Sequence, residues 1–458
     1  MIKFDKIKVK YWSLFDRNAW LYFYQCYRPH YPRLIFYACL VAVQSLFFLP
    51  VLFLIRNIFD VAIPAADISL LIKLTLFIFL IRLLSSVLGL FIRYFMIKII
   101  KIAVRDMRRE LMIHLYKLSK SFYSQTDVSE IHSQVILDTE RVDNMSDALF
   151  SAIIPASLMT IVLFFILIFL NWQLTLIALL LFPLVFIANL LSGRYVKQKT
   201  FLFQRAFEEF SKGCLFLLRQ MDLTRTQSCQ DQEIKHQMKF VDQVRSASEK
   251  MAWSHAIHGQ IQKNIMGVIG LIILVFSGIS IAGDKMSLGD FIAFYAAAGL
   301  LNGQISTILG GIPNLITGNE SLLTLRNLFQ QSLEPYTGKE HIQFKGNIQF
   351  QSVSFNYDKT MVLDSLNLTI KPHSMNIIVG SNGSGKSTIV NLILGFWRPI
   401  SGQIMLEGVD YNKIDIKALR REVGVVQQQS SLFVGTIWEN ITYGHDNVSI
   451  AEVEEAAS

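Results

Sequence analysis

The stretch that decides the fold of the C-terminal part spans residues 375–394 and reads MNIIVGSNGSGKSTIVNLIL. Five mostly apolar residues at 375–379, typical of a short strand, run into a loop that contains Gly380, Gly383 and Gly385. An apolar run that is compatible with a helix follows the loop. The loop matches GxxxxGK[ST], a motif that is credible when a strand precedes it and a helix follows. The sequence therefore predicts a phosphate-binding loop between a strand and a helix.

The residue types in this loop fit the binding of a nucleotide. Glycine has no Cβ, so the backbone can approach an anion closely, and the N–H groups at the start of the next helix attract negative charge. In this motif Lys386 places a positive charge at the β- and γ-phosphates, and the Ser387 hydroxyl binds Mg²⁺. The expected nucleotide-binding residues are Gly380, Ser381, Asn382, Gly383, Ser384, Gly385, Lys386, Ser387 and Thr388.

The residues before the loop predict the rest of a small α/β domain and a linker. Short alternating or β-branched runs at 346–350, 353–355 and 366–370 are typical of strands. A polar segment at 330–340, which contains proline and glycine, separates these strands from everything upstream.

Upstream of this linker the apolar residues fall into six blocks. The blocks cover residues 34–55, 70–97, 148–170, 174–191, 265–282 and 290–309. A bilayer crossing needs about 20 mostly apolar residues. Only 17% of the 458 residues are charged, against about 25% in ordinary soluble chains, and the charges lie mostly between the blocks. Six membrane-spanning helices are therefore predicted, in preference to the buried helices of a soluble protein.

The positive charges indicate how the helices are oriented. Lys and Arg are dense before the first block, sparse after it, and continue to alternate in this way along the chain. Cytoplasmic loops carry this excess, so the N-terminus, the intervals at about 100–147 and 193–263, and the C-terminal part are predicted to be cytoplasmic. The net charge of +8 is then a topology signal, and no nucleic-acid partner is expected.

The two long inner intervals are predicted to continue the spans as helices. Apolar residues recur at helical spacing there, for example at 102–112. A limb of roughly 25–30 residues would reach about 40 Å beyond the membrane. Each interval would then turn at an exposed tip, which is suited to contact with a cytosolic domain.

A six-span block with long inner loops, a linker and a P-loop domain resembles a half-transporter of the ATP-binding cassette (ABC) exporter type. The resemblance implies a multi-domain fold, with an all-α six-helix transmembrane exporter domain followed by an incomplete α/β P-loop domain. The expected parts are a cytoplasmic elbow at 1–33, the transmembrane domain at 34–326, a linker at 327–343 and the first half of the nucleotide-binding domain at 344–458. ATP and Mg²⁺ are the implied cofactors, in a multi-pass protein of the inner or plasma membrane.

The resemblance also implies roles for single residues. The segment VSFNY at 353–357 is similar to the strand that ends in the adenine-stacking aromatic, so Tyr357 takes that role unless it faces the core. The segment VQQQSSLF at 426–433 is similar to the Q-loop, in which Gln428 would meet Mg²⁺ and the attacking water. Residues 129–138 resemble the first inner-loop tip, and a second tip is expected near 223–231.

Three motifs of the family are not found between Phe344 and Ser458: the Leu-Ser-Gly-Gly-Gln signature, the acidic strand end and the switch histidine. The expectation is an exporter subunit that binds ATP·Mg²⁺ and cannot hydrolyse it alone, paired as a homodimer or heterodimer with another half-transporter. The alternatives are a non-hydrolysing, nucleotide-sensing subunit and an inactive remnant. A fragment, a truncated product and a split subunit all remain open.

Two arginines in the second block are candidates for substrate contact. Arg82 and Arg93 fall on one helical face with Ser86 and Gly89, and a cation at this depth usually faces a cavity or a partner. No acidic residue lies inside another block to pair with them. A cationic stripe along the path of an anionic or amphipathic substrate is the hypothesis. The alternative is an arginine that reaches the interface or bonds to a neighbouring helix.

Overall fold

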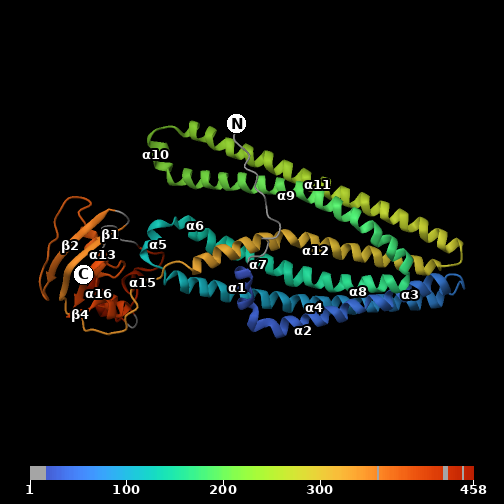
Figure 1. Cartoon of the computed structure of the whole chain (residues 1–458), viewed down its shortest axis with the longest axis horizontal. Helices are drawn as coiled ribbons and strands as arrows, with labels where there is room; N and C mark the ends of the chain where they lie inside the picture. The colour runs from blue at the N-terminus through green and yellow to red at the C-terminus, as the bar shows by residue number, and fades with distance from the viewer. Residues whose placement is uncertain (1–16, 358–359, 427–431, 446–447) are drawn as a thin grey trace. The chain divides into compact units, whose positions relative to one another are not determined.

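The computed structural model divides the chain into two compact units, each described here by itself (Figure 1). The helical unit comprises Met1–Arg109 and Gln134–Arg326, and the C-terminal unit comprises Glu110–Ser133 and Asn327–Ser458. The structure describes residues 17–357, 360–426, 432–445 and 448–458, without the side chains at 129, 182, 184–186, 189 and 190.

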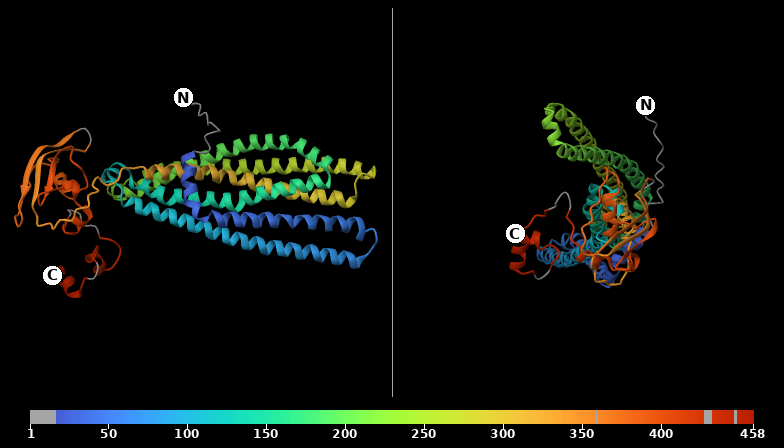
Figure 2. Two further views of the ribbon diagram at one scale, coloured as in Figure 1. Left: turned by 60° about the horizontal axis from the view of Figure 1, so that its bottom comes forward. Right: turned by 90° about the vertical axis from the view of Figure 1, so that its left-hand side faces the viewer.

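Long helices that run beside one another build the helical unit (Figure 2). Their bounds are α1 Arg17–Tyr27, α2 Tyr31–Leu46, α3 Phe48–Asn57, α4 Ile68–Leu115, α7 Thr139–Asp147, α8 Ile154–Leu170, α9 Trp172–Arg219, α10 Met221–Thr226, α11 Gln230–Ala282 and α12 Leu288–Phe329. Single helical turns of other types join them at η1 Arg28–His30, η2 Ile58–Ala62, η3 Gln134–Asp138 and η4 Ala148–Ile153. The last residues of α4 and α12 belong to the C-terminal unit.

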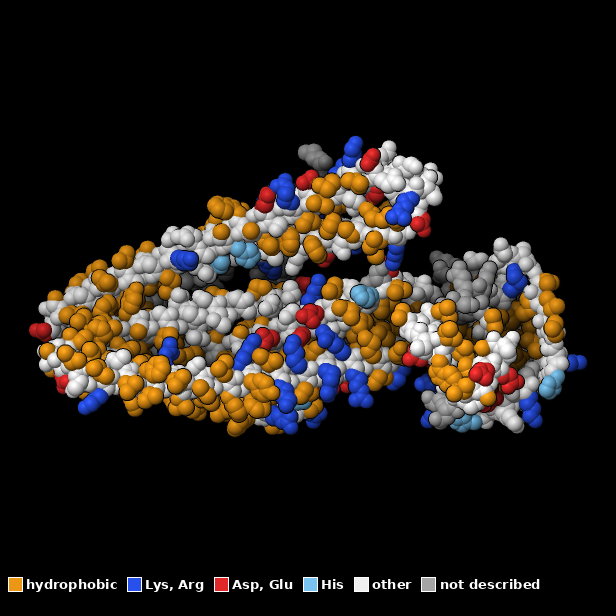
Figure 3. Space-filling view, turned by 180° about the vertical axis from the view of Figure 1, so that it is seen from behind, with side chains coloured by type: hydrophobic (Ala, Val, Ile, Leu, Met, Phe, Trp, Pro, Cys, Tyr) orange, Lys and Arg blue, Asp and Glu red, His pale blue; other side chains and the backbone are white. Residues whose placement is uncertain are grey.

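The apolar blocks form helices that present their side chains outward. Within the described residues, five helical stretches are long and apolar enough to cross a membrane, and only 11–28% of each apolar window is buried. The block at 174–191 lies in α9, whose described part adds the apolar stretch Trp172–Leu181. Hydrophobic side chains cover one end of the helical unit, and Lys and Arg gather elsewhere on it (Figure 3). A soluble protein would bury these apolar faces, whereas lipid solvates them.

The predicted extension of the spans beyond the membrane is confirmed. The helices α4, α9 and α11 contain 48, 48 and 53 residues. At 1.5 Å per residue they are about 72–80 Å long, against about 30 Å of hydrocarbon. The second inner tip also lies where it was expected, because α10 and the turn after it join α9 to α11 (Figure 1).

The first inner tip lies earlier than predicted. The chain turns at α5 Lys120–Gln125, and residues 129–138 already belong to the returning helices α6 Val128–Ser133 and η3. Ser119 caps α5 by accepting a hydrogen bond from the Phe122 N–H at 3.3 Å. The prediction of a tip at 129–138 is therefore wrong, because the cap at Ser119 starts a new helix ten residues upstream of it.

A four-stranded antiparallel sheet in the order β2-β1-β3-β4 forms the centre of the C-terminal unit. Its strands are β1 Ile348–Asn356, β2 Met361–Ile370, β3 Ser401–Leu406 and β4 Val409–Asp410. The helices of this unit are α13 Lys386–Ile393, α14 Ile416–Arg421, α15 Ile437–Ile441 and α16 Ile450–Ala457, with a short turn η5 Tyr411–Lys413. Phe350, Ile404 and Leu406 face a core that also contains Leu392 of α13.

The strand predicted at 375–379 does not form in this structure. These residues pair with no strand among the described residues, and Met375, Ile377 and Val379 are 91, 78 and 83% exposed. A strand needs hydrogen-bonding neighbours, and every strand in the described sheet pairs antiparallel with another. The apolar run predicted the strand from local pattern, but in the part of the chain that the structure describes no strand lies beside it.

Residues 330–343 pack closely on the C-terminal unit. Tyr336 is buried and its ring contacts Tyr411 edge-on at 4.7 Å. The Glu340 N–H donates to the Lys413 carbonyl at 2.9 Å, and the Asp415 N–H donates back to the Glu340 carbonyl. This segment is therefore an ordered part of the unit although its composition is that of a loop.

Candidate nucleotide-binding site

The loop at 380–385 has a backbone that only glycine adopts easily. Gly383 and Gly385 have φ angles of +84° and +90°. A Cβ at Gly385 would lie 2.9 Å from the Leu363 side chain and 3.3 Å from the Val362 side chain. The glycines therefore serve both the curvature of the loop and its close approach to β2.

The helix that follows the loop is anchored in the core. It begins at Lys386, three residues before the apolar run that the sequence predicts to be helical, and the Gly385 carbonyl accepts the N–H groups of Thr388 and Ile389 at 3.0 and 3.1 Å. Ile389 and Leu392 are buried against the sheet. A fixed helix start presents its first N–H groups to the loop, which is the arrangement that attracts a phosphate.

Lys386 lies across the mouth of the loop. Its Nζ donates to the carbonyl oxygens of Gly380 and Ser381 at 2.9 and 2.7 Å. The Lys386 side chain is thus already folded over the loop. A bound phosphate would offer it charged oxygen acceptors in place of these two neutral carbonyl oxygens. Hydrogen bonds between charged groups are roughly twice as strong as neutral ones.

Tyr357 lies next to the start of this helix. Its hydroxyl is 3.1 Å from the Thr388 hydroxyl, and its ring packs edge-on with Trp397 at 5.0 Å and with Phe355 at 4.9 Å. The ring is 41% exposed, so it has open surface beside the loop and is not buried in the core. Sequence reasoning missed Trp397, because only the folded sheet brings it to Tyr357.

The structure describes the positions of most other predicted residues of this site. Ser387 and Thr388 occupy the first turn of α13, and Asn382 and Ser384 lie in the loop. Gln428 lies outside the described residues. The roles of Tyr357, Gln428 and the loop residues toward ATP and Mg²⁺ stay predictions.

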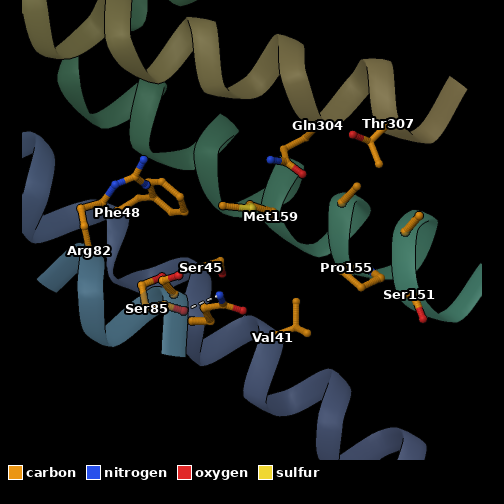
Figure 4. A pocket seen from close by; sticks show the side chains of 14 residues that line it. Val41, Ser45, Phe48, Arg82, Ser85, Ser151, Pro155, Met159, Gln304 and Thr307 are labelled. Atoms are coloured by element: carbon orange, nitrogen blue, oxygen red, sulfur yellow. Dashed lines mark hydrogen bonds between the residues drawn. The ribbon is translucent and has the colours of Figure 1, made fainter. Parts of the chain in front are cut away.

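Arg82 lines a cavity of about 510 Å³ in the helical unit (Figure 4). Its guanidinium lies 5.5 Å from the centre of the Phe48 ring. The other lining residues are Val41, Gln44, Ser45, Ser85, Ser86, Ser151, Ala152, Pro155, Ala156, Met159, Gln304 and Thr307. These twelve residues come from α2, α4, η4, α8 and α12. They surround the Arg82 cation with neutral hydrogen-bonding groups and with apolar side chains.

Arg93 is placed differently from Arg82. Its Nη2 lies 3.0 Å from Asp147 of α7, and it does not line the cavity. No acidic residue lies inside another apolar block, and Asp147, which pairs with Arg93, lies just before the third block. In the described part of the chain no carboxylate comes within ion-pair distance of Arg82.

Hydrogen bonds inside the helical unit fix α12 to other helices. The Trp20 indole N–H donates to Asn319 at 2.9 Å, and the Ser321 hydroxyl donates to the buried Asp138 at 2.8 Å. At the start of α12, Asp60 accepts the Gly289 N–H at 2.8 Å. These bonds hold the helix that contributes Gln304 to the cavity.

Comparisons with known proteins agree with this arrangement. The family model "ABC transporter transmembrane region" matches residues 34–305, and the model "ABC transporter" matches residues 363–458. The first match covers every residue that lines the cavity except Thr307, and the second covers the glycine loop.

Curated relatives align over most of this chain. The "ATP-dependent lipid A-core flippase" of Syntrophus aciditrophicus is 26% identical over 94% of this chain and 72% of its own length. The "Uncharacterized ABC transporter ATP-binding protein YwjA" of Bacillus subtilis is 27% identical over 95% of this chain and 76% of its own. The "Heterocyst differentiation ATP-binding protein HepA" of a Nostoc species is 27% identical over 77% of this chain.

The alignments span only part of each relative, and for HepA that part is 58% of its length. In this chain the match to the membrane region precedes the match to the ATP-binding region. The family model of the membrane region alone covers more than half of the 458 residues. The chain therefore belongs to the ABC transporter family, as a multi-pass membrane region fused to an ATP-binding region.

Proposed function

We propose that this chain is a subunit of an ATP-driven exporter that binds ATP·Mg²⁺ at residues 380–388. The observation that carries the proposal is the closed glycine loop with Lys386 folded over it, on a chain that also holds a cavity lined by Arg82. The glycine loop supports the binding of ATP as the energy source, and the cavity supports the binding of a transported substrate.

Each residue near the loop has a proposed role toward ATP. Lys386 holds the β- and γ-phosphates, and Ser387 binds Mg²⁺. The exposed face of Tyr357 stacks on adenine while its edges are held by Phe355 and Trp397. Gln428 contacts Mg²⁺ and the attacking water, as the family resemblance implies.

The proposed cargo is an amphipathic molecule with an anionic group. Phe48 and Met159 offer apolar contact, while Arg82 and the polar groups around it offer charge and hydrogen bonds. A cation without a carboxylate partner is costly in a membrane, and an anionic ligand would offset that cost. Flippases of lipid A-core are among the relatives, which agrees with a lipid-like cargo. Arg93 is proposed to have no role in binding, because Asp147 already neutralises it.

Turnover is proposed to need a second half-transporter, with both termini in the cytoplasm. A nucleotide-sensing subunit that binds ATP without turnover is the second candidate, because the geometry of the phosphate loop bears on nucleotide binding and not on hydrolysis.

Nucleotide titration of the full chain in lipid nanodiscs tests the proposal. Lys386→Ala should weaken ATP·Mg²⁺ binding about 10- to 100-fold, because a hydrogen bond to a charged group contributes about 1.5–3 kcal/mol. Lys371→Ala, an exposed lysine of the same unit, is the matched control and should leave affinity unchanged. Equal affinity in the Lys386→Ala variant would refute ATP binding at this loop. ATPase activity with a partner subunit would favour the exporter, and its absence would favour the sensor.

A further inference from the structure

Three residues before the sheet, Ser332–Glu334, contact two parts of the C-terminal unit at once. One part is the first inner tip, at residues 117–120, and the other is Arg420 of α14, which in turn bonds to the end of the phosphate-loop helix α13. All of these residues belong to the same compact unit.

The main chain of this segment pairs with the inner tip. The Glu334 N–H donates to the Lys117 carbonyl at 2.8 Å, and the Ser119 N–H donates to the Ser332 carbonyl at 3.0 Å. The two serine hydroxyls lie 2.9 Å apart. The bonds form a short antiparallel bridge, so the tip and the segment move together.

The side chain of Glu334 reaches in the other direction, to Arg420 of α14. Its carboxylate lies 2.7 Å from Arg420 Nη1, and both side chains are only 25% exposed. Arg420 Nε also donates to the Leu394 carbonyl at 2.9 Å, and Nη2 donates to the Gly395 carbonyl at 3.4 Å. These carbonyls end α13, where a cation is favoured by the helix dipole.

The side chains around Arg420 are tightly packed. Its guanidinium lies 4.9 Å from the centre of the Phe396 ring, and Lys120 of the inner tip lies 5.5 Å from the same ring. A Cβ at Gly395 would lie 2.6 Å from the Ile416 side chain. A displacement of the helix end must therefore displace α14 as well, because packed interiors do not absorb it.

A second side chain, Tyr411, holds the same helix end and packs on Tyr336 of the segment before the sheet. The Tyr411 hydroxyl donates to the Ile393 carbonyl, and burial raises the pKa of Tyr411, so the hydroxyl keeps its proton. Tyr411 is buried in the core, whereas Arg420 connects the helix end to Glu334.

We propose that the Glu334–Arg420 ion pair is the joint that transmits movement of the phosphate-loop helix to the first inner tip. The inference rests on the proposed binding of ATP·Mg²⁺ at residues 380–388. Glu334 and Arg420 are positioning residues, since neither lies in the phosphate loop. Their loss should uncouple the tip from nucleotide while the loop still binds it.

Hydrogen–deuterium exchange of the full chain in nanodiscs tests the joint. In the unaltered protein, ATP·Mg²⁺ should change exchange at the tip, residues 115–127. Glu334→Gln and Arg420→Gln should each reduce that change at least threefold and alter ATP affinity less than threefold. Arg421→Gln, an exposed neighbour on the same helix, is the matched control and should behave as the unaltered protein.

A full response of the tip in both single variants would overturn the joint, and so would an equal loss of response and affinity. Failure of the unaltered protein to bind ATP would instead refute the proposed function. In that case hydrogen–deuterium exchange measured without nucleotide still tests the Glu334–Arg420 joint. The amides of Ser119 and Glu334 should exchange at least threefold faster in Arg420→Gln, and an unchanged rate would contradict the joint.

Discussion

Replacement of Gly385 by alanine tests the geometry of the phosphate loop. The φ angle of this residue is +90°, and a left-handed backbone costs an L-residue roughly 1–2 kcal/mol. The new methyl would lie 2.9 Å from the end of the Leu363 side chain, and displacing that side chain from its rotamer adds about 0.5–1.5 kcal/mol. Gly385→Ala is therefore expected to cost the bound loop about 1.5–3.5 kcal/mol.

This cost should be measured as lost affinity. An empty variant loop can relax to a less strained backbone, and the strain returns when the loop closes on a phosphate. About 1.5–3.5 kcal/mol corresponds to roughly 10- to 400-fold weaker binding of ATP·Mg²⁺. A titration with a fluorescent ATP analogue measures it, with Gly424→Ala as control because a Cβ there meets no atom within 4 Å. Unchanged affinity in Gly385→Ala would show that the loop does not hold the nucleotide in this geometry.

Three further results are expected. Arg82→Ala should weaken binding of a short-chain phospholipid at least tenfold, as measured by tryptophan quenching, whereas Arg93→Ala should change it less than twofold because Asp147 pairs with Arg93. Leu392→Ala should destabilise the C-terminal unit by about 2–5 kcal/mol in urea denaturation, because its side chain is fully buried, and a loss below 1 kcal/mol would contradict this packing. Burial raises the pKa of Tyr336 to about 12 from 10, so its contribution to stability is complete below pH 10 and is lost as pH rises through 12. Tyr336→Phe should flatten that alkaline decline, and an identical decline would refute the role of this hydroxyl.

Several features of the fold could be predicted from the pattern of neighbouring residues in the sequence. The apolar blocks predicted the long outward-facing helices, because a membrane span needs only length and composition. A helix after the glycine loop was predicted because the glycines and the apolar run are adjacent in sequence, although α13 begins at Lys386, three residues before that run. The turn at α10 followed from the length of the inner interval.

Features that depend on distant partners could not be read from the chain. The apolar run at 375–379 predicts a strand, yet a strand exists only where another lies beside it. The pairs Arg93–Asp147 and Glu334–Arg420 join residues 54 and 86 positions apart, and no local signal marks them. The polar composition of residues 330–340 likewise concealed the buried ring of Tyr336.

Photolabelling with 8-azido-ATP and Mg²⁺ tests the central claim most directly. The reactive group sits on the adenine, so the label reports where the base lies on the full chain in nanodiscs. The proposed site predicts labelling of the peptide that contains Tyr357, displaced by excess ATP and strongly reduced in Lys386→Ala. Labelling that is confined to other peptides, or that is equal in Lys386→Ala, would contradict a nucleotide held by this loop.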